Sequence, residues 1–155
     1  MSVEILNESG VTIDEGRFQR LITYALDELH VHRDAELSLI FVEVPAMEQL
    51  HIRWMHEPGP TDVLSFPMDE LRPGTSDRPT DPGVLGDIVV CPDVAAEQAV
   101  RAGHPAEQEM LLLVTHGLLH LLGFDHAEPD EEKEMFALQN EILITFLHNE
   151  RIAGR

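Results

Sequence analysis

Hydrophobic and polar residues follow two different periods along the chain, and these periods divide it into strands and helices. Short apolar runs bounded by turn-forming residues predict strands at 3–6, 36–44, 61–67 and 84–91. Apolar residues spaced three and four apart predict helices that begin at Asp14 and cover 45–54, 92–102, 105–122 and 129–149. The strands lie before and between the helices without a strict alternating rhythm, which favours an α+β fold.

The length of the chain, 155 residues, fits a single domain over 1–155 that is large enough to bury a core. Residues 69–83 are rich in proline and glycine, so we expect them to form a long and mobile connection. Such a segment is either an ordinary loop or a flap over a functional cleft, and the sequence leaves both interpretations open.

The charge of the chain bears on its partners. Ten Lys and Arg face twenty-nine Asp and Glu, which gives a formal net charge of −19. Contacts to phosphates supply most nucleic-acid affinity, so composition alone argues against RNA as a partner. The lone Cys91 excludes an internal disulfide and suits a reducing cytoplasm. We expect neither a membrane span nor a signal peptide, because no long apolar segment or basic, hydrophobic leader is present.

The stretch 116–126 carries the clearest chemical signal in the chain. It reads His-Gly-Leu-Leu-His-Leu-Leu-Gly-Phe-Asp-His. His116 and His120 are four residues apart and therefore lie on the same face of a helix. Gly123 can end that helix in the left-handed conformation, and the returning chain can bring His126 to the same point. Three imidazoles without a local fourth ligand predict a zinc site with an open position, which is typical of catalytic zinc.

The residue after the first histidine argues against one class of zinc enzyme. The spacing of the three histidines is that of the metzincin zinc proteases. In those proteases the residue after the first His is Glu, which acts as general base. Gly117 stands here and cannot transfer a proton, so the motif predicts the metal scaffold without the peptidase base.

The same residues resemble the signature of the YbeY endoribonucleases, the bacterial rRNA maturation factors. The pattern is His-Gly-x-Leu-His-Leu-x-Gly-Tyr-Asp-His, with Phe124 in place of the usual Tyr. The segments 60–67, Pro-Thr-Asp-Val-Leu-Ser-Phe-Pro, and 85–89, Leu-Gly-Asp-Ile-Val, are similar to the family in order and spacing. The resemblance covers about residues 35 to 147.

This resemblance implies a small, four-stranded mixed sheet packed by helices, with one Zn²⁺ per chain in a cleft at the end of the histidine helix. It implies a zinc-dependent, single-strand-specific endoribonuclease that matures ribosomal RNA precursors, especially the small-subunit 3′ end, and acts in ribosome quality control. The expected partners are single-stranded rRNA precursors and the ribosome or small-subunit assembly factors, with no DNA and no membrane. Because the chain is acidic, RNA should follow a local basic cleft.

Two alternatives from other functional classes stay open. The first is a zinc peptidase or other hydrolase whose base comes from Asp87 or Asp125. The second is a non-catalytic ribosome-assembly protein with structural zinc, which a fourth protein ligand would favour.

Two further residues are candidates for the chemistry. Asp125 precedes the third ligand, and we expect it to hold an imidazole N–H or to handle a proton. Similar proteins usually carry Arg at the position of Met55, and Arg53 is the nearest arginine. If 53–55 is extended, Arg53 can substitute as a phosphate clamp; if it is helical, the two side chains point about 200° apart. The guanidinium would then come from a loop, from Arg72 or Arg78.

Overall fold

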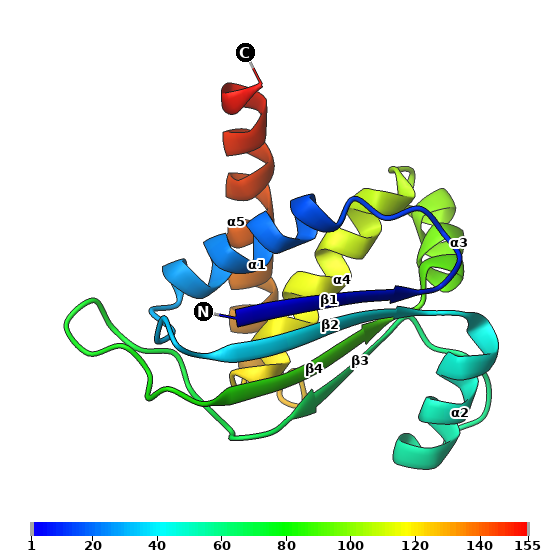
Figure 1. Ribbon diagram of the computed structural model, residues 1–155, viewed down its shortest axis with the longest axis horizontal. Coiled ribbons are helices and arrows are strands. Elements are labelled where there is room, and N and C mark those ends of the chain that lie inside the picture. The colour runs from blue at the N-terminus through cyan, green and yellow to red at the C-terminus, as the bar shows by residue number, and fades with distance from the viewer. Residues whose placement is uncertain (1, 155) are drawn as a thin grey trace.

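A computed structural model describes residues 2–154 as one four-stranded sheet with five helices (Figure 1). In chain order the elements are β1 (Ser2–Glu8), α1 (Glu15–Glu28), β2 (Glu36–Val42), α2 (Val44–Met55), β3 (Val63–Pro67), β4 (Val84–Val90), α3 (Pro92–Ala102), α4 (Ala106–Leu121) and α5 (Pro129–Ala153). The α+β class and each predicted strand and helix are confirmed, with ends that shift by a few residues. None of the described helices is long and apolar enough to cross a membrane.

The sheet is mixed, as the family resemblance implied. Its strand order is β1-β2-β4-β3, in which β1, β2 and β4 run parallel and β3 runs antiparallel to β4. The antiparallel strand lies at one edge, and the C-terminal half of α4 packs beside it and β4. The histidine helix is therefore positioned by the edge of the sheet.

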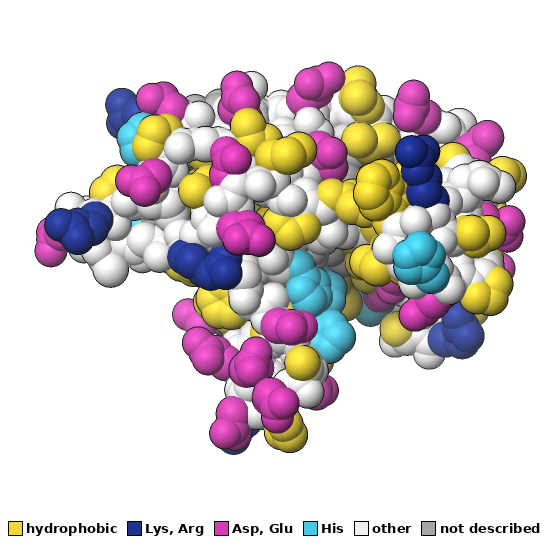
Figure 2. All heavy atoms as spheres, turned by 90° about the horizontal axis from the view of Figure 1, so that it is seen from below, with side chains coloured by type: hydrophobic (Ala, Val, Ile, Leu, Met, Phe, Trp, Pro, Cys, Tyr) yellow, Lys and Arg dark blue, Asp and Glu magenta, His cyan; other side chains and the backbone are white. Residues whose placement is uncertain are grey.

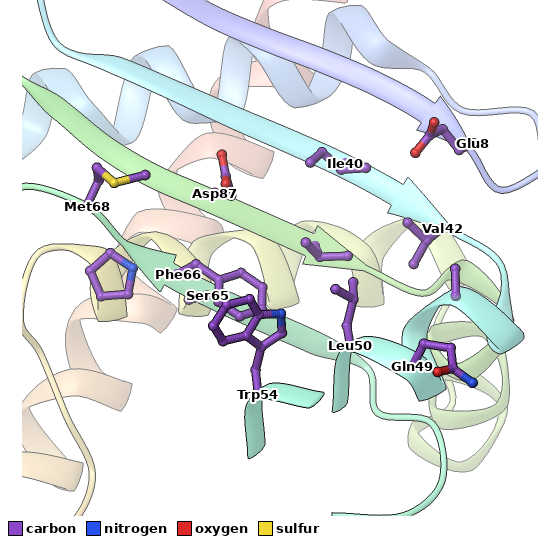
Figure 3. Close-up of a pocket in the computed structure, with 13 residues that line it drawn as sticks. Glu8, Ile40, Val42, Gln49, Leu50, Trp54, Ser65, Phe66, Met68 and Asp87 are labelled. Atoms are coloured by element: carbon purple, nitrogen blue, oxygen red, sulfur yellow. The ribbon is translucent and has the colours of Figure 1, made fainter. Parts of the chain in front are cut away.

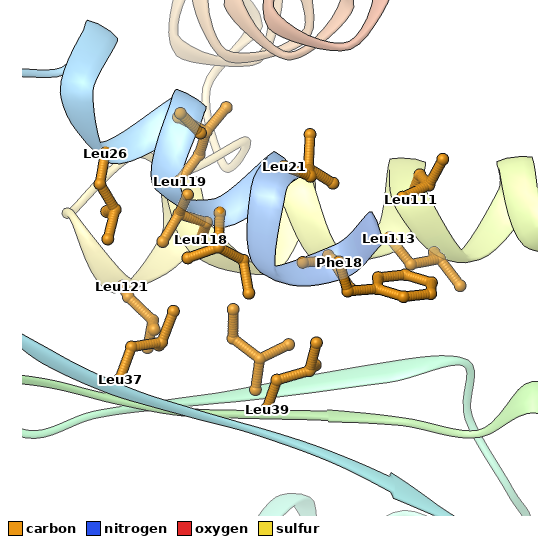
Figure 4. Packing of buried hydrophobic residues seen from close by; sticks show 14 of the residues in the cluster. Phe18, Leu21, Leu26, Leu37, Leu39, Leu111, Leu113, Leu118, Leu119 and Leu121 are labelled. Carbon is orange, nitrogen blue, oxygen red and sulfur yellow. The ribbon is translucent and has the colours of Figure 1, made fainter. Parts of the chain in front are cut away.

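The main core lies between the sheet and the helices α1 and α4 (Figure 4). Leu37, Leu39 and Phe41 of β2 point toward these helices, and each is buried. The residues between them face the opposite side, where Val42 joins a smaller cluster with Met47 of α2. Both faces of β2 are thus apolar, which explains why its sequence reads as a continuous hydrophobic run.

Helix α2 covers only part of that opposite side. Met47 is fully buried there, but Trp54 is 56% exposed. The Trp54 ring contacts Phe66 edge-to-face at 6.0 Å. The last turn of α2 therefore borders an open groove, which Leu50, Trp54 and Phe66 line together.

The connection between β3 and β4 contains no helix or strand, as its composition predicted. Its backbone is attached to the end of α1 at two points, where the N–H groups of Gly74 and Thr80 donate to the carbonyls of Leu29 and His30. Asp69 accepts from the backbone N–H of Val84 at 2.7 Å. These bonds place the segment 70–73 beside the end of α4, where Arg72 contacts Gly123.

Candidate metal centre

The end of α4 brings the three histidines together. His116 and His120 lie one turn apart, with ring centroids 4.6 Å from each other. Gly123 has φ +93° and turns the chain back, while the N–H of Phe124 donates to the carbonyl of Leu119. The His126 ring then lies 5.6 Å from His116 and 5.2 Å from His120. The predicted helix end and the convergence of the three rings are both confirmed.

The nitrogen atoms of these rings have the arrangement of a metal site. One nitrogen from each histidine lies within 4.8 Å of the other two, and the Nε2 atoms of His116 and His120 are 3.1 Å apart. Among residues 2–154, no other His, Cys, Asp or Glu joins this group. The three imidazoles can therefore hold a metal ion and leave part of its coordination sphere free.

Gln139 of α5 orients the first histidine. Its Oε1 lies 2.8 Å from Nδ1 of His116, so Nδ1 carries the proton and Nε2 offers its lone pair to the cluster. Phe136, one turn earlier on α5, stacks on His116 and His126 at 5.9 and 6.2 Å. The sequence interpretation missed both residues. The available signal was a glutamine within the apolar stripe of α5, since Gln139 is buried beside Met135 and Ile142.

Burial also sets the charge of the ligands. Burial lowers the pKa of His116, and the hydrogen bond with Gln139 opposes this only in part. Burial likewise lowers the pKa of His120, and the nearby His116 and His126 lower it further. A lowered pKa favours the neutral imidazole, which is the form that binds metal.

The edge strand β3 forms the other wall of the site. A cavity of about 420 Å³ lies between the histidines and β3, lined by Met55, Asp62, Val63, Leu64, Ser65, Pro67, His116, His120 and His126. Figure 2 shows histidine side chains in a hollow of this face, with many acidic side chains on the lobe beside it. Asp62 is the carboxylate that lines this cavity. It was quoted only as part of a motif in the sequence interpretation, and neither Asp87 nor Asp125 lines the cavity.

Gly117 lets α4 approach β3 closely. A Cβ atom at this position would lie 2.9 Å from Ser65 Oγ and 3.0 Å from Ile88 Cγ2. Ser65 also donates to the carbonyl of Gly117 at 3.1 Å. This close packing accounts for a glycine in the interior of the helix.

Asp125 and Asp87 occupy different surroundings. The Asp125 carboxylate accepts from the backbone N–H of His126 at 2.7 Å, so it holds the backbone of the third ligand, whereas Gln139 holds an imidazole ring. Asp87 lines a larger cavity of about 830 Å³ on the other side of the sheet, with Trp54 and Phe66 (Figure 3). This larger groove is mainly apolar and contains none of the three histidines. The metal chemistry therefore belongs to the smaller cavity.

A family model described as endoribonuclease YbeY matches residues 4–147. The chain belongs to the YbeY family. The endoribonuclease YbeY of Clavibacter michiganensis subsp. michiganensis is 71% identical over 151 residues, which are 97% of this chain and 99% of that protein. The endoribonuclease YbeY of Beutenbergia cavernae is 69% identical over 147 residues, 95% of this chain and 98% of that protein. The solution structure of TM1509 from Thermotoga maritima has a TM-score of 0.65 at 26% identity and covers 97% and 93% of the two chains.

The position at which YbeY sequences usually carry Arg is at the site, but Arg53 is not. Residues 53–55 are helical, so the extended geometry that would let Arg53 replace Met55 is absent. Met55 lines the histidine cavity, whereas Arg53 does not line it and its guanidinium lies 5.3 Å from the Trp54 ring. Among the described residues that line the cavity, none is Lys or Arg.

Proposed function

We propose that this chain is a zinc-dependent endoribonuclease that cleaves single-stranded ribosomal RNA precursors, including the 3′ end of the small-subunit rRNA. The observation that carries the proposal is the convergence of His116, His120 and His126 in a chain of the YbeY family. Relatives that align over almost the whole chain are named endoribonucleases. A role in ribosome quality control, contacts with small-subunit assembly factors and a cytoplasmic location belong to the same proposal.

The donor set fits Zn²⁺. Zinc binds imidazole nitrogens at about 2.0–2.1 Å, so two such nitrogens in a tetrahedral site lie about 3.3–3.4 Å apart. The Nε2 atoms of His116 and His120 are 3.1 Å apart, and all three ligand atoms lie within 4.8 Å, so small side-chain rotations suffice. When bound, such an ion supplies Lewis-acid polarisation of a phosphoryl oxygen and lowers the pKa of water.

The chain's own residues would prepare the site for an RNA phosphate. Gln139 fixes the tautomer of His116, and Asp125 holds the backbone that carries His126. The Asp62 carboxylate lines the cavity and accepts from the N–H of Val63 at 2.7 Å, which orients it. A carboxylate in this place is a candidate to accept a proton from the attacking group.

The structure argues against both the zinc peptidase and the non-catalytic protein with structural zinc. The peptidase alternative takes its base from Asp87 or Asp125, and neither carboxylate lines the histidine cavity. Gly117, the residue after the first ligand, has no side chain that could serve instead. The structural-zinc alternative requires a fourth protein ligand, and residues 2–154 supply three to the cluster. An open metal position beside a cavity of about 420 Å³ favours catalysis.

The proposal is tested with purified full-length protein, single-stranded rRNA fragments and casein. The wild type should contain one zinc per chain by elemental analysis and should cleave the RNA but not casein. The double variant His116→Ala, His120→Ala should lose the zinc and the RNA cleavage, because a single remaining imidazole binds zinc weakly. A double variant that retains one zinc per chain would show that these histidines are not the ligands. Cleavage of casein by the wild type would favour the peptidase.

A further inference from the structure

The histidine cavity has no permanent positive charge in its own lining. Its charged lining residue is the Asp62 carboxylate, and the chain as a whole carries a net charge of −19. Figure 2 shows few Lys and Arg side chains among the acidic ones on the face with the histidines. Apart from a bound metal ion, an RNA phosphate meets only the negative charge of Asp62 in this lining, so a cationic side chain near the cavity would influence binding.

Arg72 lies beside the turn that joins two of the ligands, although it is not part of the cavity lining itself. Its guanidinium lies against Gly123, in the space that a side chain would otherwise fill. A Cβ atom at Gly123 would be 2.6 Å from both Cζ and Nε of Arg72. Gly123 sits three residues after His120 and three before His126, so the guanidinium contacts the turn that joins two of the three ligands. Three residues span at most about 10 Å, so the backbone that Arg72 contacts lies within that distance of both His120 and His126.

The hydrogen bonds of Arg72 leave one edge of its guanidinium free. Nη1 donates to the carbonyls of Glu70 and Leu71 at 3.2 and 3.3 Å, and these bonds fix the group to its own loop. Among residues 2–154, no carboxylate oxygen lies within 4.0 Å of it, and Nε and Nη2 make no hydrogen bond within the same part of the chain. The Nε–Nη2 edge is the one with which arginine binds two oxygens of a phosphate.

Other arginines are engaged or placed elsewhere. Arg17 is paired with Glu107 and Glu150 on the far end of α4 and α5. Arg53 lies against Trp54, outside the histidine cavity. Arg78 is in the same loop as Arg72 and is also exposed, but it is not among the atoms nearest to Gly123.

We propose that Arg72 binds an RNA phosphate beside the three histidines and so supplies the cationic side chain that the cavity lining lacks. This inference rests on the proposed endoribonuclease function and assigns a substrate-binding residue to it. The glycine at 123 then has two roles, because it turns the chain toward His126 and leaves room for the guanidinium.

The test compares Arg72→Ala, Arg72→Lys and Arg78→Ala with the wild type, all loaded with zinc, on one single-stranded RNA. Arg78→Ala is the matched control, since it removes the same charge from the same loop. Arg72→Ala should lower cleavage roughly 10- to 100-fold with unchanged zinc content, somewhat less than the effect of losing a buried charge-stabilising donor. Arg72→Lys should recover part of the loss, because it restores the charge without the two-oxygen contact. Arg78→Ala should cleave at nearly the wild-type rate.

A second measurement separates binding from folding. In the non-cleaving His116→Ala, His120→Ala background, adding Arg72→Ala should weaken RNA binding and reduce the slope of log K against log salt by roughly one phosphate contact. Equal rates for Arg72→Ala and wild type would overturn the role of Arg72 and leave the nuclease function standing. Equal losses in Arg72→Ala and Arg78→Ala would replace it with a general charge effect. Loss of zinc in both Arg72 variants would show that Arg72 has a structural role. A wild type that cleaves no RNA would overturn the proposed endoribonuclease function.

Discussion

The two faces of the sheet differ in how completely they are packed. On one face Leu39 is fully buried under α1 and α4, and the metal ligands extend from the end of α4. On the other face its neighbour Ile40 is half-buried and lines the groove of about 830 Å³ next to Trp54 (Figure 3). Ligand positions must be held within fractions of an ångström, and only the fully packed face offers such support. The open face contributes apolar surface without fixing its side chains from all sides.

The largest expected effect compares adjacent residues of β2. Leu39→Ala should lower the free energy of unfolding by about 2–5 kcal/mol, because it leaves a cavity in the closed core. Ile40→Ala should cost clearly less, since this side chain already borders solvent in the groove. Urea unfolding of the two variants measures the difference. Equal losses would show that the groove face is packed as tightly as the helical face, and the comparison would fail.

The next effect concerns the buried and exposed supports of the ligands. Gln139→Leu should weaken zinc binding by about 10- to 100-fold, because the Nδ1–H group of His116 loses its acceptor. Asp125→Asn should change the affinity by less than about tenfold, since an amide oxygen can accept the same bond from His126. Competition with a chromophoric chelator gives both constants, and the exposed Asn140→Ala on the same helix is the control. A larger loss in Asp125→Asn than in Gln139→Leu would give Asp125 the more direct role.

The smallest effect sharpens the contact between α4 and β3. In Gly117→Ala, the added Cβ forces Ser65 and Ile88 outward, which should cost about 1–3 kcal/mol. The better helix propensity of alanine returns about 1 kcal/mol of that. Adding Ser65→Ala to Gly117→Ala should recover part of the lost stability. Denaturant unfolding of the wild type, the two single variants and the double variant measures this coupling. A Gly117→Ala variant as stable as the wild type would show that β3 yields easily and does not position the histidine helix.

Local patterns predicted the metal centre, and contacts between distant segments could not be read from them. His116, His120, Gly123 and His126 follow from helical spacing and one left-handed residue, which are local rules. Gln139 escaped because its role depends on how α5 packs on α4, although its place in an apolar stripe was a signal. Placing Arg53 required a decision on whether 53–55 is helical, which the sequence alone left open.

Arg72 in the loop before β4 and Trp54 at the end of α2 also depend on contacts that the sequence alone does not reveal. Arg72 could be named as one of two alternatives, but its contact with Gly123 depends on a connection without regular structure. The exposure of Trp54 could not be predicted, because helical periodicity shows which side of a helix is apolar and not whether another element covers that side. Strand and helix positions were predictable throughout, since both faces of β2 and the stripes of α1 and α4 carry continuous apolar patterns.

All three ligands come from a single helix end and the turn that follows it, and this has a consequence for the order of assembly. The metal joins residues that are already neighbours in sequence, so it closes only a short loop and contributes little to bringing distant segments together. His116 and His120 are only half-buried and His126 is exposed, so none of the three belongs to the fully buried core. We predict that the chain folds before it takes up its ion, and that a chelator leaves its far-ultraviolet circular dichroism and cooperative melting intact. Loss of either on chelation would contradict this. The supply of metal would then switch the activity of protein that is already folded, without new protein synthesis.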